Sequence, residues 1–165
     1  MLKNLNHPNI VKYYGYKQDQ EFLYIYMEQM SGGSISSMLK QYGSFDEEVI
    51  KIFVKQIVQG LSYLHSLGVV HRDIKGANIL SNGNGIVKLA DFGAARIKQN
   101  LKVNRLQESE FCESAKGSLF WMAPEVIKQE THGRKSDIWS LGCTIIEMAS
   151  GKHPWDGVKN RVFKS

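Results

Sequence analysis

Four polar side chains in the middle of the sequence have the types and the spacing that transfer of a phosphoryl group requires. Asp73, Lys75 and Asn78 lie within six residues, and Asp91 follows thirteen residues after Asn78. An aspartate can accept the proton of an attacking hydroxyl group, and a nearby lysine can place positive charge on the phosphate. Asparagine and aspartate oxygens are hard ligands that suit Mg²⁺. The sequence therefore predicts Asp73 as the base, Lys75 as the phosphate-binding cation, and Asn78 and Asp91 as metal ligands.

A glycine-rich hairpin between Asn78 and Asp91 is expected to bring these two ligands together. Apolar runs at residues 79–80 and 86–89 flank a segment of Ser, Asn and Gly at residues 81–85. Its Asn-Gly pairs supply the positive φ angles that tight hairpin turns require. Because Asn78 precedes the hairpin and Asp91 follows it, a tight turn returns Asp91 to the neighbourhood of Asn78.

Helices are expected to dominate the rest of the chain, with strands only near its start and in its middle. Residues 10–16 and 22–27 are predicted to form two strands separated by a polar turn. Residues 34–41 are predicted to form a short helix after a Ser-Gly-Gly break. The chain therefore begins with a small strand unit and continues as a mainly helical one.

Two longer helices and one long loop complete the prediction. The first helix opens with a capping box, in which Ser44 is the N-cap and Glu47 the third helical residue, and it ends at Gly68. Residues 136–150 form the second helix, which is apolar on most sides and is therefore expected to be buried and central. Residues 93–116 are polar and irregular, and a loop that long inside a compact domain is functional or disordered.

Composition excludes several other classes of protein. The 165 residues have a net charge of +5 and contain two widely separated cysteines. No dense run of Lys and Arg indicates nucleic-acid binding, and no cysteine spacing indicates a disulfide framework or a zinc site. The most apolar stretch is too short to span a membrane, and the first residues lack the features of a signal peptide. We therefore expect a soluble, cytoplasmic protein, whose oligomeric state the sequence leaves open.

Three short motifs occur in an order that is typical of one enzyme family. They are His71-Arg72-Asp73, Asp91-Phe92-Gly93 and Ala123-Pro124-Glu125. In protein kinases these motifs belong to the catalytic loop, the metal-binding segment and the segment after the activation loop. The chain therefore resembles a eukaryotic protein kinase over nearly its whole length. The lysine two residues after the catalytic aspartate resembles the serine/threonine type.

Within this family, three segments most resemble MAP kinase kinase kinases. They are residues 71–80, 117–127 and 135–155. Kinases that act one tier upstream in the same cascades share much of this sequence, so membership of that group stays open as an alternative. The resemblance implies an enzyme that uses ATP and Mg²⁺ to phosphorylate serine or threonine in a protein substrate, which is a MAP kinase kinase in the closest subgroup.

The resemblance also implies an α+β fold of the protein-kinase type that is truncated at both ends. Residues 1–30 correspond to a remnant of the N-terminal lobe and hinge, with two strands of its sheet. Residues 31–165 correspond to a C-terminal lobe without its last helices. The glycine-rich phosphate loop and the strand lysine paired with a helix glutamate are absent from the sequence. We therefore expect the 165 residues alone to be inactive, and a non-catalytic scaffold or decoy is the alternative.

The nucleotide-binding residues can be carried over from the same resemblance. Met27 corresponds to the residue that guards the back of the adenine pocket, and a plain buried strand residue is the alternative. Glu28 and Met30 fall on the connecting segment, whose backbone binds adenine. Ser34 corresponds to the position near the ribose, and Leu80 to the aliphatic floor beneath adenine.

Four further residues correspond to structural positions of the family. His71 and Phe92 belong to the column of apolar contacts that is aligned in active enzymes. Asp137 corresponds to the buried carboxylate that accepts hydrogen bonds from the catalytic loop, although it could also be a helix-start charge. Glu125 corresponds to a residue that pairs with an arginine further along the chain.

Regulation is expected to act through the segment before the Ala-Pro-Glu motif. Arg72 lies next to the base, and an arginine there can form a two-point contact with a phosphate on the activation loop. Ser114 is the preferred phosphate acceptor from its distance to Gly117, and Ser109 is the alternative. Ser118 stands where most kinases of this type have threonine.

Overall fold

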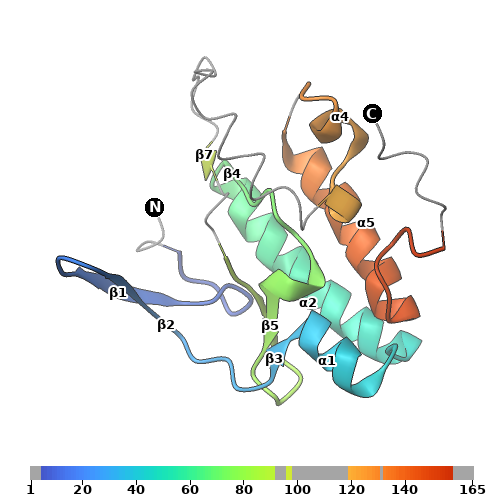
Figure 1. Ribbon diagram of the computed structural model, residues 1–165, viewed down its shortest axis with the longest axis horizontal. Helices are drawn as coiled ribbons and strands as arrows, with labels where there is room; N and C mark the ends of the chain where they lie inside the picture. The colour runs from blue at the N-terminus through green and yellow to red at the C-terminus, as the bar shows by residue number, and fades with distance from the viewer. Residues whose placement is uncertain (1–4, 92–95, 98–118, 131, 158–165) are drawn as a thin grey trace.

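A computed structural model of the chain describes residues 5–91, 96–97, 119–130 and 132–157. Figure 1 shows a strand pair that extends away from a helical part, in which the two long helices pack against each other. The mixture of helices and small antiparallel sheets confirms the predicted α+β class. The elements in chain order are β1 (Tyr13–Gln18), β2 (Leu23–Met27), β3 (Gly33–Ser34), α1 (Ile35–Tyr42), α2 (Glu47–Ser66), β4 (Val69–Val70), the 3-10 turn η2 (Gly76–Asn78), β5 (Ile79–Ser81), β6 (Val87–Leu89), β7 (Arg96–Ile97), the 3-10 turn η4 (Leu119–Trp121), α4 (Pro124–Ile127) and α5 (Arg134–Ser150).

Strands β1 and β2 form an antiparallel pair, in which Tyr13 lies opposite Met27 and Gln18 opposite Leu23. Both predicted strands are confirmed, although the first begins three residues later than expected. Most side chains of the pair are exposed, because no other described element covers either of its faces. Met27 is 53% exposed, so the alternative that it is a plain buried strand residue is wrong.

The predicted hairpin between the two metal ligands is present as the antiparallel pair β5–β6, and β3 adds a third strand on the other side of β5. Gly83 and Gly85 in the connecting turn have φ angles of 84° and 81°. Glycine adopts this left-handed region without steric cost, which is why the Asn-Gly pairs can close the turn. Ile79 then lies opposite Leu89, so the residues just outside the hairpin face each other.

Helix α1 begins as expected, with Ser34 as its N-cap accepting a hydrogen bond from the Ser37 backbone N–H at 3.1 Å. Helix α2 begins later than the capping box predicts, because its N-cap is Asp46 rather than Ser44. The Phe45 backbone N–H donates instead to the carbonyl oxygen of Met148 in α5, at 2.9 Å. The predicted cap at Ser44 is wrong, since the helix begins at Glu47. The Phe45 bond ties the segment before α2 to α5.

Helix α5 packs against α2 and begins two residues before the expected start. The prediction that it is buried is only partly met, because Ile138, Trp139 and Ile146 are 55%, 40% and 48% exposed. The largest core cluster joins it to α2 and to the hairpin. Core side chains from these three elements include Ile57, Leu61 and Leu64 of α2, Val87 and Leu89 of β6, and Leu141 and Met148 of α5. Among the described residues, no helix combines the length and hydrophobicity that crossing a membrane requires.

Candidate active site

Asp73, Lys75 and Asn78 lie in direct contact in the loop between β4 and β5. The Asp73 carboxylate oxygen Oδ2 is 2.9 Å from the Lys75 ammonium nitrogen and 2.7 Å from the Asn78 amide nitrogen. The same amide nitrogen donates to the Asp73 backbone carbonyl at 2.9 Å. The side chain of Asp73 remains 21% exposed, so a substrate hydroxyl group can reach it. The geometry therefore combines a fixed carboxylate with access from outside.

Asp91 is brought to the same place by the hairpin. The backbone N–H of Ala90 donates to the carbonyl oxygen of Asn78 at 2.9 Å, directly beyond the last paired residues of β5 and β6. Asp91 is the next residue, and its side chain is exposed. The sequence prediction that the turn returns Asp91 towards Asn78 is thus met in the backbone.

Asn78 and Asp91 fit the demands of a Mg²⁺ site. Among the described residues, the hydrogen bonds of the Asn78 side chain all use its nitrogen Nδ2, and its oxygen Oδ1 has none. The described residues contain no group of three His, Cys, Asp or Glu side chains that could hold a metal ion. A site of one amide and one carboxylate oxygen suits Mg²⁺, which keeps water and phosphate oxygens as its other ligands.

Two residues of this site have strained backbones. Arg72 and Asp91 have φ angles of 75° and 58°, in the left-handed region that residues with a side chain rarely adopt. Such conformations cost about 1–3 kcal/mol each and persist only where the surroundings enforce them. The two positions lie directly before Asp73 and at Asp91, and Gln129, outside this site, has a φ angle of 58° as well.

His71 connects the base to the hairpin from a fully buried position. Burial lowers the pKa of His71, and this effect outweighs the opposite influence of Asp137, Asp73 and Asp91. The neutral ring fits its contacts, because Nδ1 accepts from the Asp73 backbone N–H at 3.3 Å and Nε2 lies 3.0 Å from the Ala90 carbonyl oxygen. An imidazole with one acceptor and one donor nitrogen satisfies both partners.

Asp137, in the first turn of α5, accepts the hydrogen bonds that the family resemblance predicts. Its carboxylate receives the backbone N–H groups of His71 at 3.0 Å and Arg72 at 2.9 Å. The His65 ring nitrogen Nε2 lies 2.8 Å from the same carboxylate. Asp137 is only 1% exposed, so these contacts are shielded from water and hold the catalytic loop on α5.

Glu125, in the first turn of α4, is held by a neutral partner. Its oxygen Oε1 accepts a hydrogen bond from the Ser136 hydroxyl group at 3.0 Å. This bond ties α4 to the start of α5. The ion pair with an arginine that the resemblance implies remains a prediction.

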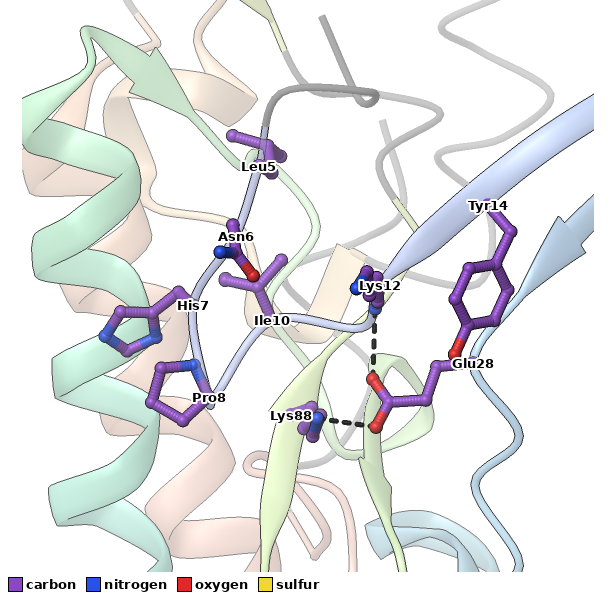
Figure 2. A pocket seen from close by; sticks show the side chains of 9 residues that line it. All are labelled: Leu5, Asn6, His7, Pro8, Ile10, Lys12, Tyr14, Glu28 and Lys88. Atoms are coloured by element: carbon purple, nitrogen blue, oxygen red, sulfur yellow. Dashed lines mark hydrogen bonds and ion pairs between the residues drawn. The ribbon is translucent and has the colours of Figure 1, made fainter.

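The side chain of Glu28, on the segment after β2, is held by contacts with two lysines. Figure 2 shows it directed towards Lys12 and Lys88, in a small pocket of about 180 Å³. Its carboxylate lies 2.6 Å from the Lys88 ammonium group and accepts the Lys12 backbone N–H at 3.1 Å. Burial alone would raise the pKa of Glu28, but the contacts with Lys88 and Lys12 lower it below its usual value. The side chain is therefore engaged, and so is the backbone N–H of Glu28, which donates to the Lys12 carbonyl oxygen at 2.8 Å. The carbonyl oxygen is the part of Glu28 that a nucleotide could use.

The other residues assigned to nucleotide binding lie on the segment after Glu28 and on strand β5. Ser34 in β3 lies directly opposite Leu80 in β5, so these two predicted contacts are brought together. Met30 is half-buried, and its carbonyl oxygen accepts the Gly33 backbone N–H at 3.4 Å. Phe92, Ser114 and Ser118 lie outside the described residues.

Sequence reasoning assigned no role in the site to His65, Lys88 or Glu147, although each makes a short polar contact there. For Glu147 a usable signal exists in the spacing of the buried polar residues of α5. They stand at intervals of three, four and three residues, which places them on one face of a helix: Asp137, Ser140, Thr144 and Glu147. Polar residues repeated on one face of an otherwise apolar helix indicate buried partners.

Comparison with known proteins extends over almost the whole chain. A family model described as "Protein kinase domain" matches residues 1–164. Mitogen-activated protein kinase kinase kinase A of Dictyostelium discoideum is 52% identical over 158 residues, which are 96% of this chain and 16% of the relative. Mitogen-activated protein kinase kinase kinase 3 of Arabidopsis thaliana is 54% identical over 155 residues, or 94% of this chain and 23% of the relative. The protein of that name from Mus musculus is 49% identical over 157 residues, or 94% of this chain and 24% of the relative. The chain thus spans about a sixth to a quarter of the length of these relatives.

Proposed function

The chain belongs to the protein kinase family, and from this membership we propose that it is part of an enzyme that transfers the γ-phosphate of ATP to serine or threonine in a protein. The substrate that we propose is a MAP kinase kinase, because the relatives with about half of their aligned residues identical are named MAP kinase kinase kinases. ATP and Mg²⁺ are the co-substrate and metal that this assignment requires.

The observation that carries the proposal is the hydrogen-bonded set of Asp73, Lys75 and Asn78, joined through the backbone of Ala90 to Asp91. Each residue type has a task in phosphoryl transfer, and the fold places all of them around one loop. If the motifs occurred by chance, these side chains would not be expected to lie around the same loop.

In the proposed mechanism, Asp73 orients the substrate hydroxyl group and accepts its proton as the new bond to phosphorus forms. The bonds from Lys75 and Asn78 keep the carboxylate in one orientation, which reduces the entropy that the reaction must otherwise lose. Lys75 also faces the site with a positive charge that can stabilise the transferred phosphoryl group.

Asn78 and Asp91 are the residues that would hold Mg²⁺. The bound ion supplies positive charge that offsets the negative charge on the phosphate oxygens. Asn78 contributes its amide oxygen Oδ1, because its nitrogen is engaged by Asp73. Asp91 contributes a carboxylate from the strained position directly after the hairpin.

The test is a radiolabel-transfer assay with the full-length protein, ATP, Mg²⁺ and a purified MAP kinase kinase. We expect Asp73→Asn to lower kcat by roughly two to four orders of magnitude, the usual contribution of a general base. Asp19→Asn is the matched control, since Asp19 lies in the exposed turn after β1 and accepts from the backbone N–H groups of Glu21 and Phe22. Equal activity of Asp73→Asn and Asp19→Asn would overturn the assignment. A wild-type protein that binds the substrate without transferring phosphate would favour the scaffold alternative.

A further inference from the structure

The buried carboxylate of Glu147, near the C-terminal end of α5, is surrounded by three hydrogen-bond donors from three different segments. It accepts from the Ser36 hydroxyl group in α1 at 2.7 Å, from the Gly76 backbone N–H at 3.0 Å and from the Trp121 indole N–H at 3.0 Å. Glu147 is 6% exposed, and the described residues contain no ion pair to it. A buried carboxylate without a cation is tolerable only when hydrogen bonds of this kind satisfy it.

The contact with Gly76 is closer than any other residue type would permit. A Cβ atom on residue 76 would lie 2.6 Å from Oε1 of Glu147 and 2.8 Å from the hydroxyl oxygen of Ser36. The turn can therefore approach Glu147 only because residue 76 has no side chain. The hydrogen bond and the close approach together describe a turn packed directly against the carboxylate.

Gly76 opens the 3-10 turn η2, which joins two residues of the candidate site. Lys75 is the residue directly before Gly76, and its carbonyl oxygen accepts the backbone N–H of Asn78 at 3.0 Å. Fixing the Gly76 amide on Glu147 therefore fixes the backbone that carries Lys75 and Asn78. Since Asp73 is hydrogen-bonded to both side chains, its orientation depends on the same turn.

Trp121 connects this arrangement to the segment that follows the long loop. Its backbone carbonyl accepts the Ser140 hydroxyl group at 2.8 Å, while its indole N–H donates to Glu147. Ser140 and Glu147 are seven residues apart on α5, which is two helical turns on one face. Helix α5 thus holds Trp121 through Ser140 and through Glu147. The Glu147 carboxylate also binds Gly76 of the turn η2.

We propose that Glu147 is a positioning residue, whose carboxylate fixes the turn carrying Lys75 and Asn78 and couples it to the placement of Trp121. The inference rests on the proposed kinase function for its effect on turnover, whereas the anchoring of Gly76 is a property of the fold. Glu147 touches neither phosphate nor metal in this account. It acts by holding the residues that do.

The experiment compares Glu147→Gln with Thr144→Val in the full-length protein. Glutamine keeps the size of the side chain, and its NH2 group can donate to the Ser36 hydroxyl oxygen, but it offers the Gly76 and Trp121 N–H groups a neutral oxygen in place of a carboxylate, which weakens both bonds. Thr144 is as deeply buried on the same face of α5, and its hydroxyl group bonds only within the helix, to the Ser140 carbonyl at 2.8 Å. The pair therefore separates loss of the anchor from a general weakening of α5.

For Glu147→Gln we expect kcat to fall by about 10- to 100-fold, because two bonds to a charged acceptor each become weaker by about 1 kcal/mol when the acceptor is neutral. KM for ATP should change by less than about threefold, because the proposed adenine contacts lie elsewhere. Trp121→Phe removes one donor and should lower kcat less, and its effect should be less than additive with that of Glu147→Gln. Thr144→Val should leave kcat unchanged.

Amide hydrogen exchange provides a readout that does not depend on activity. We expect exchange in the peptide around Gly76 to accelerate by about tenfold or more in Glu147→Gln and not in Thr144→Val. Unchanged exchange and kcat in Glu147→Gln would overturn the inference, as would equal losses in the two variants. If the wild-type protein transfers no phosphate, the proposed function fails, and the exchange result alone then decides whether Glu147 anchors the turn.

Discussion

The strand pair β1–β2 and the helix α5 position the two halves of the candidate site by different physical means. The strand pair leads to the residues assigned to adenine, and its aromatic side chains, including Tyr16 at 63% exposed, have little around them. Helix α5 holds the residues assigned to phosphate transfer through two buried carboxylates. Asp137 accepts the backbone N–H of His71, and Glu147 accepts the backbone N–H of Gly76. The comparison teaches that the chemical half of the site is fixed by buried hydrogen bonds, whereas the nucleotide half depends on backbone pairing and one ion pair.

The largest difference between the two regions should appear when the Asp137 carboxylate is removed. Asp137→Ala leaves the backbone N–H groups of His71 and Arg72 buried without an acceptor, at about 1–3 kcal/mol each. We expect the free energy of unfolding to fall by about 2–6 kcal/mol and phosphate transfer to be lost. Chemical unfolding followed by circular dichroism measures the first effect, and Glu130→Ala on the exposed surface is the control. A loss below about 1 kcal/mol would contradict the account of the catalytic loop.

A matched pair of phenylalanines compares the two regions directly. Phe53 in α2 is 5% exposed and contacts the ring of Phe45 edge-on, with centroids 5.8 Å apart. Phe22, next to β2, is 60% exposed. We expect Phe53→Ala to cost about 3–5 kcal/mol of stability and Phe22→Ala less than about 0.5 kcal/mol. Similar losses in urea unfolding of the two variants would remove the distinction between the regions.

A pH dependence should arise from His132, which lies between the described ends of α4 and α5. Burial and the nearby Arg72 lower its pKa to about 4, against the opposite influence of Asp137 and Glu125. An unfolded histidine has a pKa near 6.5, so between pH 6.5 and 4 the unfolded chain binds a proton that the folded chain does not. Stability should therefore decrease as the pH falls through this window.

The measurement for His132 is the unfolding midpoint as a function of pH. His132→Gln should flatten the slope between about pH 6.5 and 4, and part of the slope should remain because burial also lowers the pKa of His71. An unchanged slope in His132→Gln would show that this imidazole does not carry the effect.

The smallest effect is expected at the ion pair between Glu28 and Lys88, which fixes the nucleotide half. Glu28→Gln should raise KM for ATP by about two- to fivefold, because a partly buried pair of this kind contributes about 1 kcal/mol. Lys88→Met should have a similar effect, and the double variant should be no worse than either single one. Strictly additive effects in the kinetic assay would mean that the pair does not act as a unit.

Much of the site could be predicted from short sequence segments. The order of the three motifs indicated the protein kinase family, and residues 71–80, 117–127 and 135–155 indicated its MAP kinase kinase kinase group. The comparisons confirm both resemblances. The hairpin was predictable because its Asn-Gly pairs specify a turn locally, and that turn is sufficient to bring Asp91 back to Asn78. The start of α2 was predicted two residues too early from the local capping box, and the segment before it is tied by Phe45 to the distant Met148, a contact that no local pattern contains.

The sequence by itself determined which residues can do the chemistry, because their types and their spacing within about twenty positions decide what the loop and hairpin can bring together. Only the tertiary structure decided which carboxylates hold that loop, since the bonds of Asp137 and Glu147 join residues 65 to 71 positions apart. The free energy of such a bond depends on both partners being excluded from water at the same point. That condition is a property of the packed chain and cannot be read from either segment alone.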